Sequence, residues 1–313
     1  MSKCFSLTAS RNWCLRSGLT SLGLRSTVTD LGDGTVMHCW VPKLPKPTRQ
    51  DLVLIHGFGA NALWQWYDTV RLLVPHFNVY VPDLVFFGES FTTRTERTES
   101  FQAQCVKRVM DANSVGKKMI VVGLSYGGFV AYSMAAQFKD CVEKVVIMCA
   151  GVCLEEKDLK TGLFPVMDVE DAAKILLPQT AEKMRELVAY VFVKPPKGIP
   201  SCLLNDFIDE MCMQYIEEKK ELLRAIPKDR KLSDLPKITQ PTLIIWGDQD
   251  RIFPLELAYR LKRHLGENAE LVVIKNTGHA FIHEKSKECH KHLKHFLLNS
   301  KRTNPTANRQ NHS

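Results

Sequence analysis

Residues 118–137 constrain the fold more than any other part of this 313-residue chain. The apolar run Lys118–Leu124 has the composition of a strand that is buried on both faces. It ends in Gly123-Leu-Ser-Tyr-Gly127, and the stretch Tyr126–Gln137 that follows is typical of a helix. A serine on a sharp strand-to-helix turn needs small residues two positions away on each side, because larger side chains would collide there. The sequence therefore predicts that Ser125 is presented on such a turn.

The rest of the chain alternates short apolar runs with helix-like segments. The predicted strands are Thr27–Leu31, Thr35–Val41, Asp51–His56, Phe77–Pro82, Lys118–Leu124, Val142–Ala150, Pro241–Gly247 and Glu270–Lys275. The predicted helices are Ala62–Val74, Ser100–Asn113, Tyr126–Gln137, Pro254–His264 and His279–Leu298. This alternation indicates an α/β fold with a mostly parallel sheet that helices cover on both faces. Gly32-Asp-Gly34 between the first two runs predicts an antiparallel hairpin at one edge.

The middle of the chain interrupts this alternation. It contains three helix-like runs and no strand pattern, at Val169–Leu177, Thr180–Val191 and Leu203–Lys219. We predict that residues 152–235 form a helical cap, inserted into an α/β core made of residues 27–151 and 236–298. Residues 299–313 are polar and poor in apolar side chains, so we expect them to be disordered.

Residues 1–26 form a basic, weakly amphipathic segment without acidic residues. We expect first a short helix packed on the edge of the domain. The second interpretation is an interfacial helix that contacts a membrane or a lipid substrate. The third is an organelle transit peptide, which such a composition resembles.

The net charge of +8 is carried by the two ends of the chain. Residues 1–29 carry +4 and residues 289–313 carry +5, so the 259 residues between them sum to −1. A nucleic-acid-binding protein places its positive charge on a folded face, so nucleic acid is not an expected partner. No apolar stretch approaches the about 20 residues that cross a bilayer. We therefore expect a soluble, cytoplasmic protein; peripheral membrane contact through the N-terminus and cap, or a plastid or mitochondrial location, are the alternatives.

Ten cysteines are scattered along the chain without a CxxC pair. This spacing supports neither a dense disulfide framework nor a zinc site, and we expect buried free thiols. The run Cys289–His295 contains three histidines that do not share one helical face, so a solvated helix face is expected there. No metal and no organic cofactor is expected, since a serine nucleophile with its base and an oxyanion hole suffices for acyl chemistry.

A serine hydroxyl becomes an effective nucleophile when a base takes its proton. His279 is the candidate, because it follows the last predicted strand and so lies at the carboxyl end of the sheet, where ligands bind in such folds. His283 is the alternative base. The acid that orients the base is expected in the loop after the preceding strand. We choose Asp250 over Asp248, because Asp248 adjoins the strand end and is typical of a turn-stabilising residue.

Acyl transfer also needs hydrogen-bond donors for the oxyanion of the tetrahedral intermediate. We expect these donors to be the backbone N–H groups of Tyr126 and of Phe58, which lies in the loop His56-Gly-Phe-Gly59. The apolar run Leu84–Phe87 follows a strand end and is predicted to line an acyl pocket together with the cap. We assign His56, Phe86 and Phe87 to this substrate pocket as a hypothesis. Packing of the same run against the cap is the alternative.

These motifs resemble the α/β-hydrolase superfamily over about Thr27–Leu298. The matching segments are His56–Gly59, Asp83–Ser90, Gly123–Gly128, Gly247–Pro254 and Thr277–His279. Within the superfamily, the chain is similar to the monoacylglycerol-lipase-like and esterase-like members common in plants. The resemblance implies a catalytic triad of Ser125, Asp250 and His279. Phe86 stands where many members have a glycine, which makes that loop bulkier and more apolar.

The function expected from these observations is hydrolysis of a lipophilic small ester, such as a monoacylglycerol, through an acyl-enzyme. Two alternatives stay open: a small-molecule receptor with low turnover that uses the same pocket, and an acyltransferase or lyase on the same triad. Dehalogenase and epoxide-hydrolase chemistry is disfavoured, because those relatives use aspartate where this chain has Ser125. The sequence assigns no oligomeric state.

Overall fold

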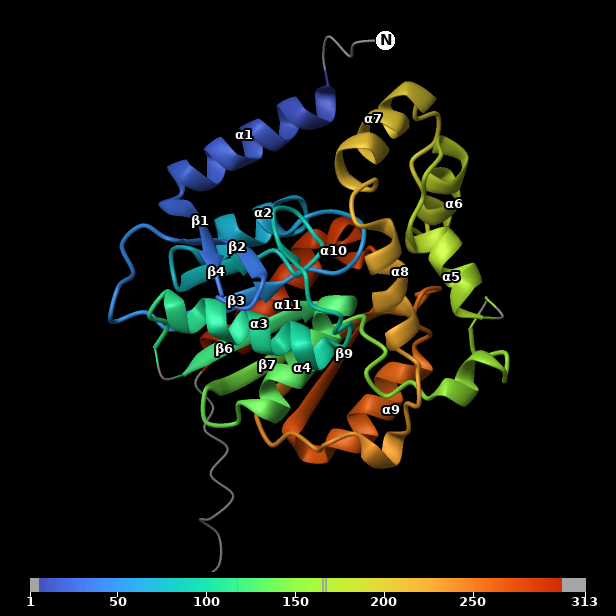
Figure 1. Cartoon of the computed structure of the whole chain (residues 1–313). Coiled ribbons are helices and arrows are strands. Elements are labelled where there is room, and N and C mark those ends of the chain that lie inside the picture. The colour runs from blue at the N-terminus through green and yellow to red at the C-terminus, as the bar shows by residue number, and fades with distance from the viewer. Residues whose placement is uncertain (1–5, 117, 165, 167, 300–313) are drawn as a thin grey trace, which may run out of the picture.

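The computed structural model describes residues 6–116, 118–164, 166 and 168–299. A nine-stranded sheet has the order β1-β2-β4-β3-β6-β7-β8-β9, and β5 pairs with β2 (Figure 1). The strands are β1 (Leu24–Asp30), β2 (Thr35–Pro42), β3 (Asp51–Ile55), β4 (Asn78–Pro82), β5 (Phe91–Thr92), β6 (Met119–Leu124), β7 (Val142–Met148), β8 (Thr242–Gly247) and β9 (Ala269–Ile274). The α-helices are α1 (Leu7–Ser21), α2 (Ala62–Leu73), α3 (Glu99–Ala112), α4 (Tyr126–Gln137), α5 (Val169–Leu176), α6 (Ala181–Val191), α7 (Ser201–Met211), α8 (Ile216–Ala225), α9 (Glu256–Leu265), α10 (Phe281–Glu284) and α11 (Ser286–Leu298).

The N-terminal hairpin forms the antiparallel edge of the sheet, as the sequence predicts. β1 and β2 pair from Leu24 opposite Pro42 to Asp30 opposite Val36. Both glycines of the predicted turn have positive φ, 76° at Gly32 and 79° at Gly34, which glycine adopts without steric cost. β1 starts at Leu24, so the hairpin takes in the last residues of the segment that we had separated from the core at residue 26.

The parallel part of the sheet places three loops at one edge. β3, β4, β6, β7, β8 and β9 run parallel, and all six residues of the central strand β6 are buried. α3 and α4 cover one face, and α2 and α11 cover the other (Figure 1). This two-sided cover explains why β4, β6 and β8 are buried at every position rather than at alternate ones. The loops after β6, β8 and β9 meet at the carboxyl edge, where ligands bind in open α/β sheets.

The cap consists of α5 to α8, inserted between β7 and β8, and the described residues between 152 and 235 contain no strand. The end of α6 reaches the loop after β9, where the Ala280 N–H donates to the Val191 carbonyl at 2.9 Å. One predicted cap helix, Leu203–Lys219, is instead two helices. The break lies before α8, where Tyr215 adopts the left-handed conformation with φ 55°.

α1 packs against both the core and the cap (Figure 1). The indole N–H of Trp64 on α2 donates to Asn12 Oδ1 at 3.1 Å. At the N-terminal end of α1, the Thr8 N–H donates to the carboxylate of Asp206 on α7 at 2.8 Å. The first of the three interpretations for this segment, a helix packed on the domain edge, agrees with these contacts.

Other predictions are corrected or lie outside the described residues. The predicted last helix starts later, at Phe281, and is interrupted at Lys285, where φ −133° and ψ 53° end α10 before α11 begins. The short strand β5 has no signal in the sequence.

The nine cysteines that the structure describes are free thiols, and most of them are buried. No helix within the described ranges is both long and apolar enough to span a bilayer. The predicted disordered tail falls almost entirely outside them.

Candidate active site

Ser125 lies between the last residue of β6 and the first residue of α4, in a strained backbone conformation with φ 54° and ψ −123°. Its two glycine neighbours are required by close backbone approach. A Cβ at Gly123 would lie 2.1 Å from the carbonyl oxygen of Gly127, and a Cβ at Gly127 would lie 2.3 Å from that of Ile55. A positive φ at a non-glycine residue costs free energy that surrounding packing must offset, and such residues cluster at functional sites.

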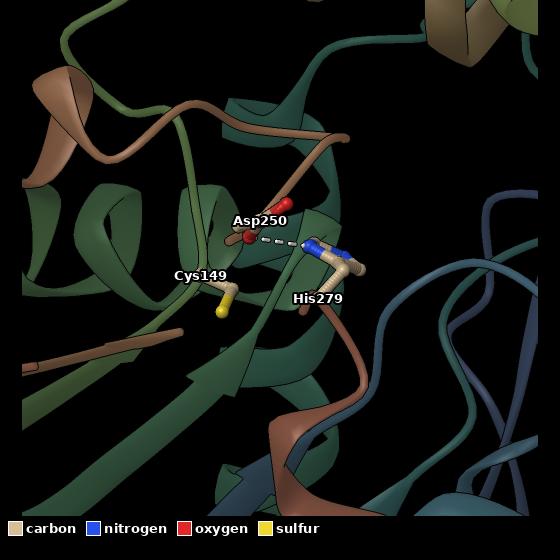
Figure 2. A group of neighbouring side chains, drawn as sticks. All are labelled: Cys149, Asp250 and His279. Carbon is tan, nitrogen blue, oxygen red and sulfur yellow. Dashed lines mark hydrogen bonds and ion pairs between the residues drawn. The ribbon is translucent and has the colours of Figure 1, made fainter. Parts of the chain in front are cut away.

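Asp250 and His279 form a hydrogen-bonded pair in loops that follow β8 and β9. Asp250 Oδ2 lies 2.8 Å from His279 Nδ1, and Figure 2 shows the two side chains facing each other. The other carboxylate oxygen, Oδ1, accepts the N–H groups of Ile252 at 2.8 Å and Phe253 at 2.9 Å. Asp248 instead accepts the Thr277 N–H at 3.3 Å. Of the two carboxylates weighed, the structure thus pairs Asp250 with the histidine.

Ser125 and His279 line the same cavity, which has a volume of about 350 Å³. His283, the alternative base, also lines it, and burial lowers the pKa of His283. The cap contributes a set of apolar side chains to the cavity wall: Leu176, Pro178, Met184, Leu187, Val188, Val191, Phe192 and Phe207. The sequence did not single out these residues, because their helical spacing equally fits packing within the cap.

The two backbone segments that carry the predicted oxyanion donors lie beside Ser125. Phe58 and Gly59 line the cavity beside Ser125. A Cβ at Gly57 would lie 2.8 Å from Ser125 Cβ, so a glycine is needed for this close approach. Tyr126 is the first residue of α4, where a backbone N–H has no acceptor within its own helix. Its ring packs edge-on against that of Phe58, with centroids 5.0 Å apart, which fixes the two segments relative to each other.

None of the three residues assigned to the substrate pocket lines the cavity that contains Ser125, so this hypothesis is corrected. His56 is fully buried, and its Nε2 accepts the Leu84 N–H at 2.9 Å, so it joins two core loops. Burial also lowers the pKa of His56. Phe86 packs against Tyr215 of the cap, with ring centroids 5.7 Å apart. Phe87 lines a small neighbouring cavity with Gly59 and packs on Phe58. The alternative, packing of this loop against the cap, describes Phe86 better.

Two residues that lie beside the Asp250–His279 pair or its loop, Glu284 and Cys149, were missed by the sequence analysis. Glu284 accepts the Gly278 N–H at 2.7 Å and the Val193 N–H at 2.9 Å, so it ties the loop that carries His279 to the cap. Cys149 is buried beside Asp250, and Figure 2 shows its thiol next to the pair. No sequence pattern marks either residue, because each makes its contacts with segments that are distant in the sequence.

Cys149, Asp250 and His279 are also the group of potential metal ligands found among the described residues, with ligand atoms within 4.8 Å of one another. A cysteine binds a metal ion in its thiolate form. Burial raises the pKa of Cys149 well above its ordinary value, so its thiol stays protonated near neutral pH. Because Asp250 and His279 already bind each other, this cluster is better described as a hydrogen-bonded pair with a neutral thiol beside it.

The sequence profile of the alpha/beta hydrolase family matches residues 52–291, and the chain belongs to this family. The fold described above is the α/β-hydrolase fold with a helical cap. The uncharacterized hydrolase YugF of Bacillus subtilis is 29% identical over 258 residues, which cover 80% of this chain and 91% of YugF. Monoacylglycerol lipase abhd6-A of Xenopus laevis is 26% identical over 280 residues, 84% of this chain and 80% of that lipase. A crystal structure of a membrane phospholipase A superposes with a TM-score of 0.78 at 24% identity, covering 93% and 90% of the two chains.

Proposed function

We propose that the chain is a carboxylic ester hydrolase in which Ser125 forms an acyl-enzyme. The observation that carries the proposal is the meeting of three loops at one edge of the sheet. Ser125 on its strained turn and His279, held by Asp250, line a single apolar cavity. The similarity to monoacylglycerol lipases supports an ester as the substrate.

The hydrogen bond between Asp250 and His279 defines the proton transfer. An ionised carboxylate accepts hydrogen bonds only, so His279 Nδ1 carries a proton and Nε2 is free to accept one. Nε2 takes the hydroxyl proton of Ser125 while Oγ attacks the ester carbonyl carbon. The N–H groups of Phe58 and Tyr126 would stabilise the oxyanion. The leaving alcohol receives the proton from His279, and a water molecule activated by the same base then hydrolyses the acyl-enzyme.

The cavity wall favours a lipophilic substrate, and we propose a monoacylglycerol or a similar small ester. Leu176 at the end of α5 lines this cavity and also a second, almost entirely apolar cavity of about 90 Å³. The second cavity lies between the cap and the loop after Asp250, with Phe164 and Phe253 in its wall. An acyl chain that starts at Ser125 would pass Leu176 and place its end there.

Turnover of a panel of p-nitrophenyl esters and monoacylglycerols tests the proposal. We expect Ser125→Ala to lower kcat/KM by at least about 1,000-fold, since the nucleophile is removed. Ser133→Ala on the same helix is the matched control, because Ser133 Oγ accepts a hydrogen bond from Gln137 and Ser133 does not line the cavity. A fluorophosphonate probe should label Ser125. Ester turnover that survives Ser125→Ala in a folded protein contradicts the proposal.

The same panel of esters distinguishes the hydrolase from the two alternatives, a small-molecule receptor and an acyltransferase or lyase. A protein that is labelled at Ser125 and stabilised by an ester, but does not turn it over, would be a receptor. Formation of a new ester in the presence of an alcohol acceptor, at the expense of free acid, would identify an acyltransferase.

A further inference from the structure

A second chain of serine, histidine and aspartate lies outside the cavity. Ser26 of β1 places Oγ 2.8 Å from His38 Nε2, and His38 Nδ1 lies 2.8 Å from Asp83 Oδ2. His38 is on the neighbouring strand β2, and Asp83 follows β4. The order of atoms is the one that activates a serine hydroxyl: an imidazole with one nitrogen on a carboxylate and the other on the hydroxyl.

The surroundings of Asp83 define which nitrogen of His38 carries a proton. Asp83 Oδ1 accepts the Ala62 N–H at 2.8 Å, so the side chain acts as a hydrogen-bond acceptor at both oxygens. A carboxylate that accepts from His38 requires the proton on Nδ1. His38 Nε2 is then free to accept the hydroxyl proton of Ser26.

The base is rigid, and the hydroxyl is accessible. His38 is 1% and Asp83 4% exposed. Ser90 fixes both, because its Oγ accepts the His38 N–H at 2.9 Å and donates to the Asp83 carbonyl at 2.8 Å. Ser26 itself is exposed on the edge strand of the sheet. An electrophile from solvent therefore reaches the hydroxyl, while the imidazole and carboxylate behind it are held in place.

We propose that Ser26 is a second nucleophilic serine, one that reacts with activated acyl and phosphonyl compounds. Ser26 Oγ attacks the carbonyl carbon of an activated ester, its proton passes to His38 Nε2, and the leaving phenolate departs. His38 then releases the proton to solvent, which leaves a neutral imidazole and an acylated Ser26. With a fluorophosphonate, Oγ attacks phosphorus and fluoride leaves.

The backbone around Ser26 distinguishes its reactivity from that of Ser125. Ser26 lies within an extended strand, whereas Ser125 precedes the N-terminus of α4, whose N–H groups face developing negative charge. Ser26 therefore reacts more slowly, and its adduct accumulates instead of turning over. Absence of one oxyanion donor alone slows acyl transfer about 100- to 1,000-fold.

The test uses the full chain with Ser125→Ala, so that labelling at the proposed active site is absent. The protein is treated with a fluorophosphonate or p-nitrophenyl acetate, and the modified residues are mapped by peptide mass spectrometry. We expect a single adduct on Ser26, which is lost with Ser26→Ala. His38→Gln should slow the labelling of Ser26 at least about 100-fold, because it removes the base.

Ser21 serves as the internal control. It is an exposed serine whose Oγ donates to the Ser17 carbonyl at 3.0 Å, so no imidazole activates it. Labelling of Ser26 no faster than Ser21 would overturn the proposal, as would undiminished labelling in a folded His38→Gln protein. If His38→Gln does not fold, the comparison of Ser26 with Ser21 within one folded protein decides. The outcome is independent of ester hydrolysis at Ser125.

Discussion

At the scale of single residues, backbone hydrogen bonds as well as His279 orient the side chain of Asp250. Two backbone N–H groups hold one carboxylate oxygen, which leaves the other directed at His279 Nδ1. Such a carboxylate fixes the tautomer of the imidazole and stabilises the imidazolium that forms when the base takes a proton. The identity of the atom that faces His279 therefore matters more than the volume of the side chain.

We predict that Asp250→Asn lowers kcat about 1,000- to 10,000-fold while the protein stays folded. The amide oxygen still accepts from Ile252 and Phe253, but the amide N–H₂ then faces His279 Nδ1. That contact places the ring proton on Nε2, which must be unprotonated to accept the proton of Ser125. Steady-state kinetics with a p-nitrophenyl ester measure the loss. Asp248→Asn is the control, and equal activity of the two variants would count against the assigned roles.

At the scale of elements, the loop that carries His279 depends on the cap. Glu284 of α10 uses one carboxylate oxygen for the N–H of Gly278 and the other for the N–H of Val193, two residues after α6. The two parts of the chain are thus joined by hydrogen bonds to a single side chain. Any change at that side chain affects the position of the base relative to the cavity.

Glu284→Gln should lower kcat about 10-fold and destabilise the fold by about 1–3 kcal/mol. Glutamine offers one oxygen, so its amide N–H₂ must face a backbone N–H, which then lacks an acceptor. Kinetics and urea unfolding measure the two effects. Glu288→Gln, on the neighbouring helix α11 with a solvent-exposed ion pair to Lys285, should change neither. Wild-type kcat in Glu284→Gln would show that the loop needs no such link.

The second apolar cavity should set the preference for acyl-chain length. Ala172 of α5 lines this cavity and not the one that contains Ser125. We predict that Ala172→Trp lowers kcat/KM for long-chain esters at least about 10-fold, because the cavity is filled, and spares butyrate esters. Lys174→Trp, exposed on the same helix, is the matched control. A loss that is uniform across chain lengths would contradict this use of the cavity.

The sequence was sufficient where a signal is local. The apolar strands and the helix Tyr126–Gln137 follow from composition and period, and the hairpin follows from its glycines. The helix break at Tyr215 was not predictable, because a tyrosine with positive φ is held there by tertiary contacts. Chain order and loop position were enough to select Ser125, Asp250 and His279 as candidates. Glu284, Cys149 and the cavity-lining cap residues depend on how the cap meets the core, which no local pattern encodes.

At the scale of the whole molecule, several histidines with lowered pKa values make the fold sensitive to acid. Burial lowers the pKa of His56, His283 and His290, and also that of His264. These side chains are neutral in the folded protein at pH values where the unfolded chain, with a pKa near 6.5, already binds protons. The unfolded state thus gains protons first as the pH falls, so stability is fully present above about pH 6.5 and declines below it.

We predict that the free energy of unfolding falls by at least about 1 kcal/mol between pH 7.5 and pH 5. Urea unfolding at a series of pH values measures the slope. His290→Gln should make the slope shallower, because it removes one of these groups but can keep the hydrogen bond to Thr69. His295→Gln, exposed on the same helix, is the control. A pH-independent stability over this range would refute the argument.

The N-terminal helix couples the two halves of the molecule. One end is bonded to the cap through Asp206, its middle is bonded to the core through Trp64, and Arg11 between them borders the cavity. α1 therefore bonds the cap to the core beside the cavity, so a displacement of the cap relative to the core would either move this helix or break these hydrogen bonds. Removing the residues before Ser10, or fusing another protein to the N-terminus, would consequently change how readily bulky molecules enter and leave the cavity. Neither change alters a residue that takes part in the proposed reaction.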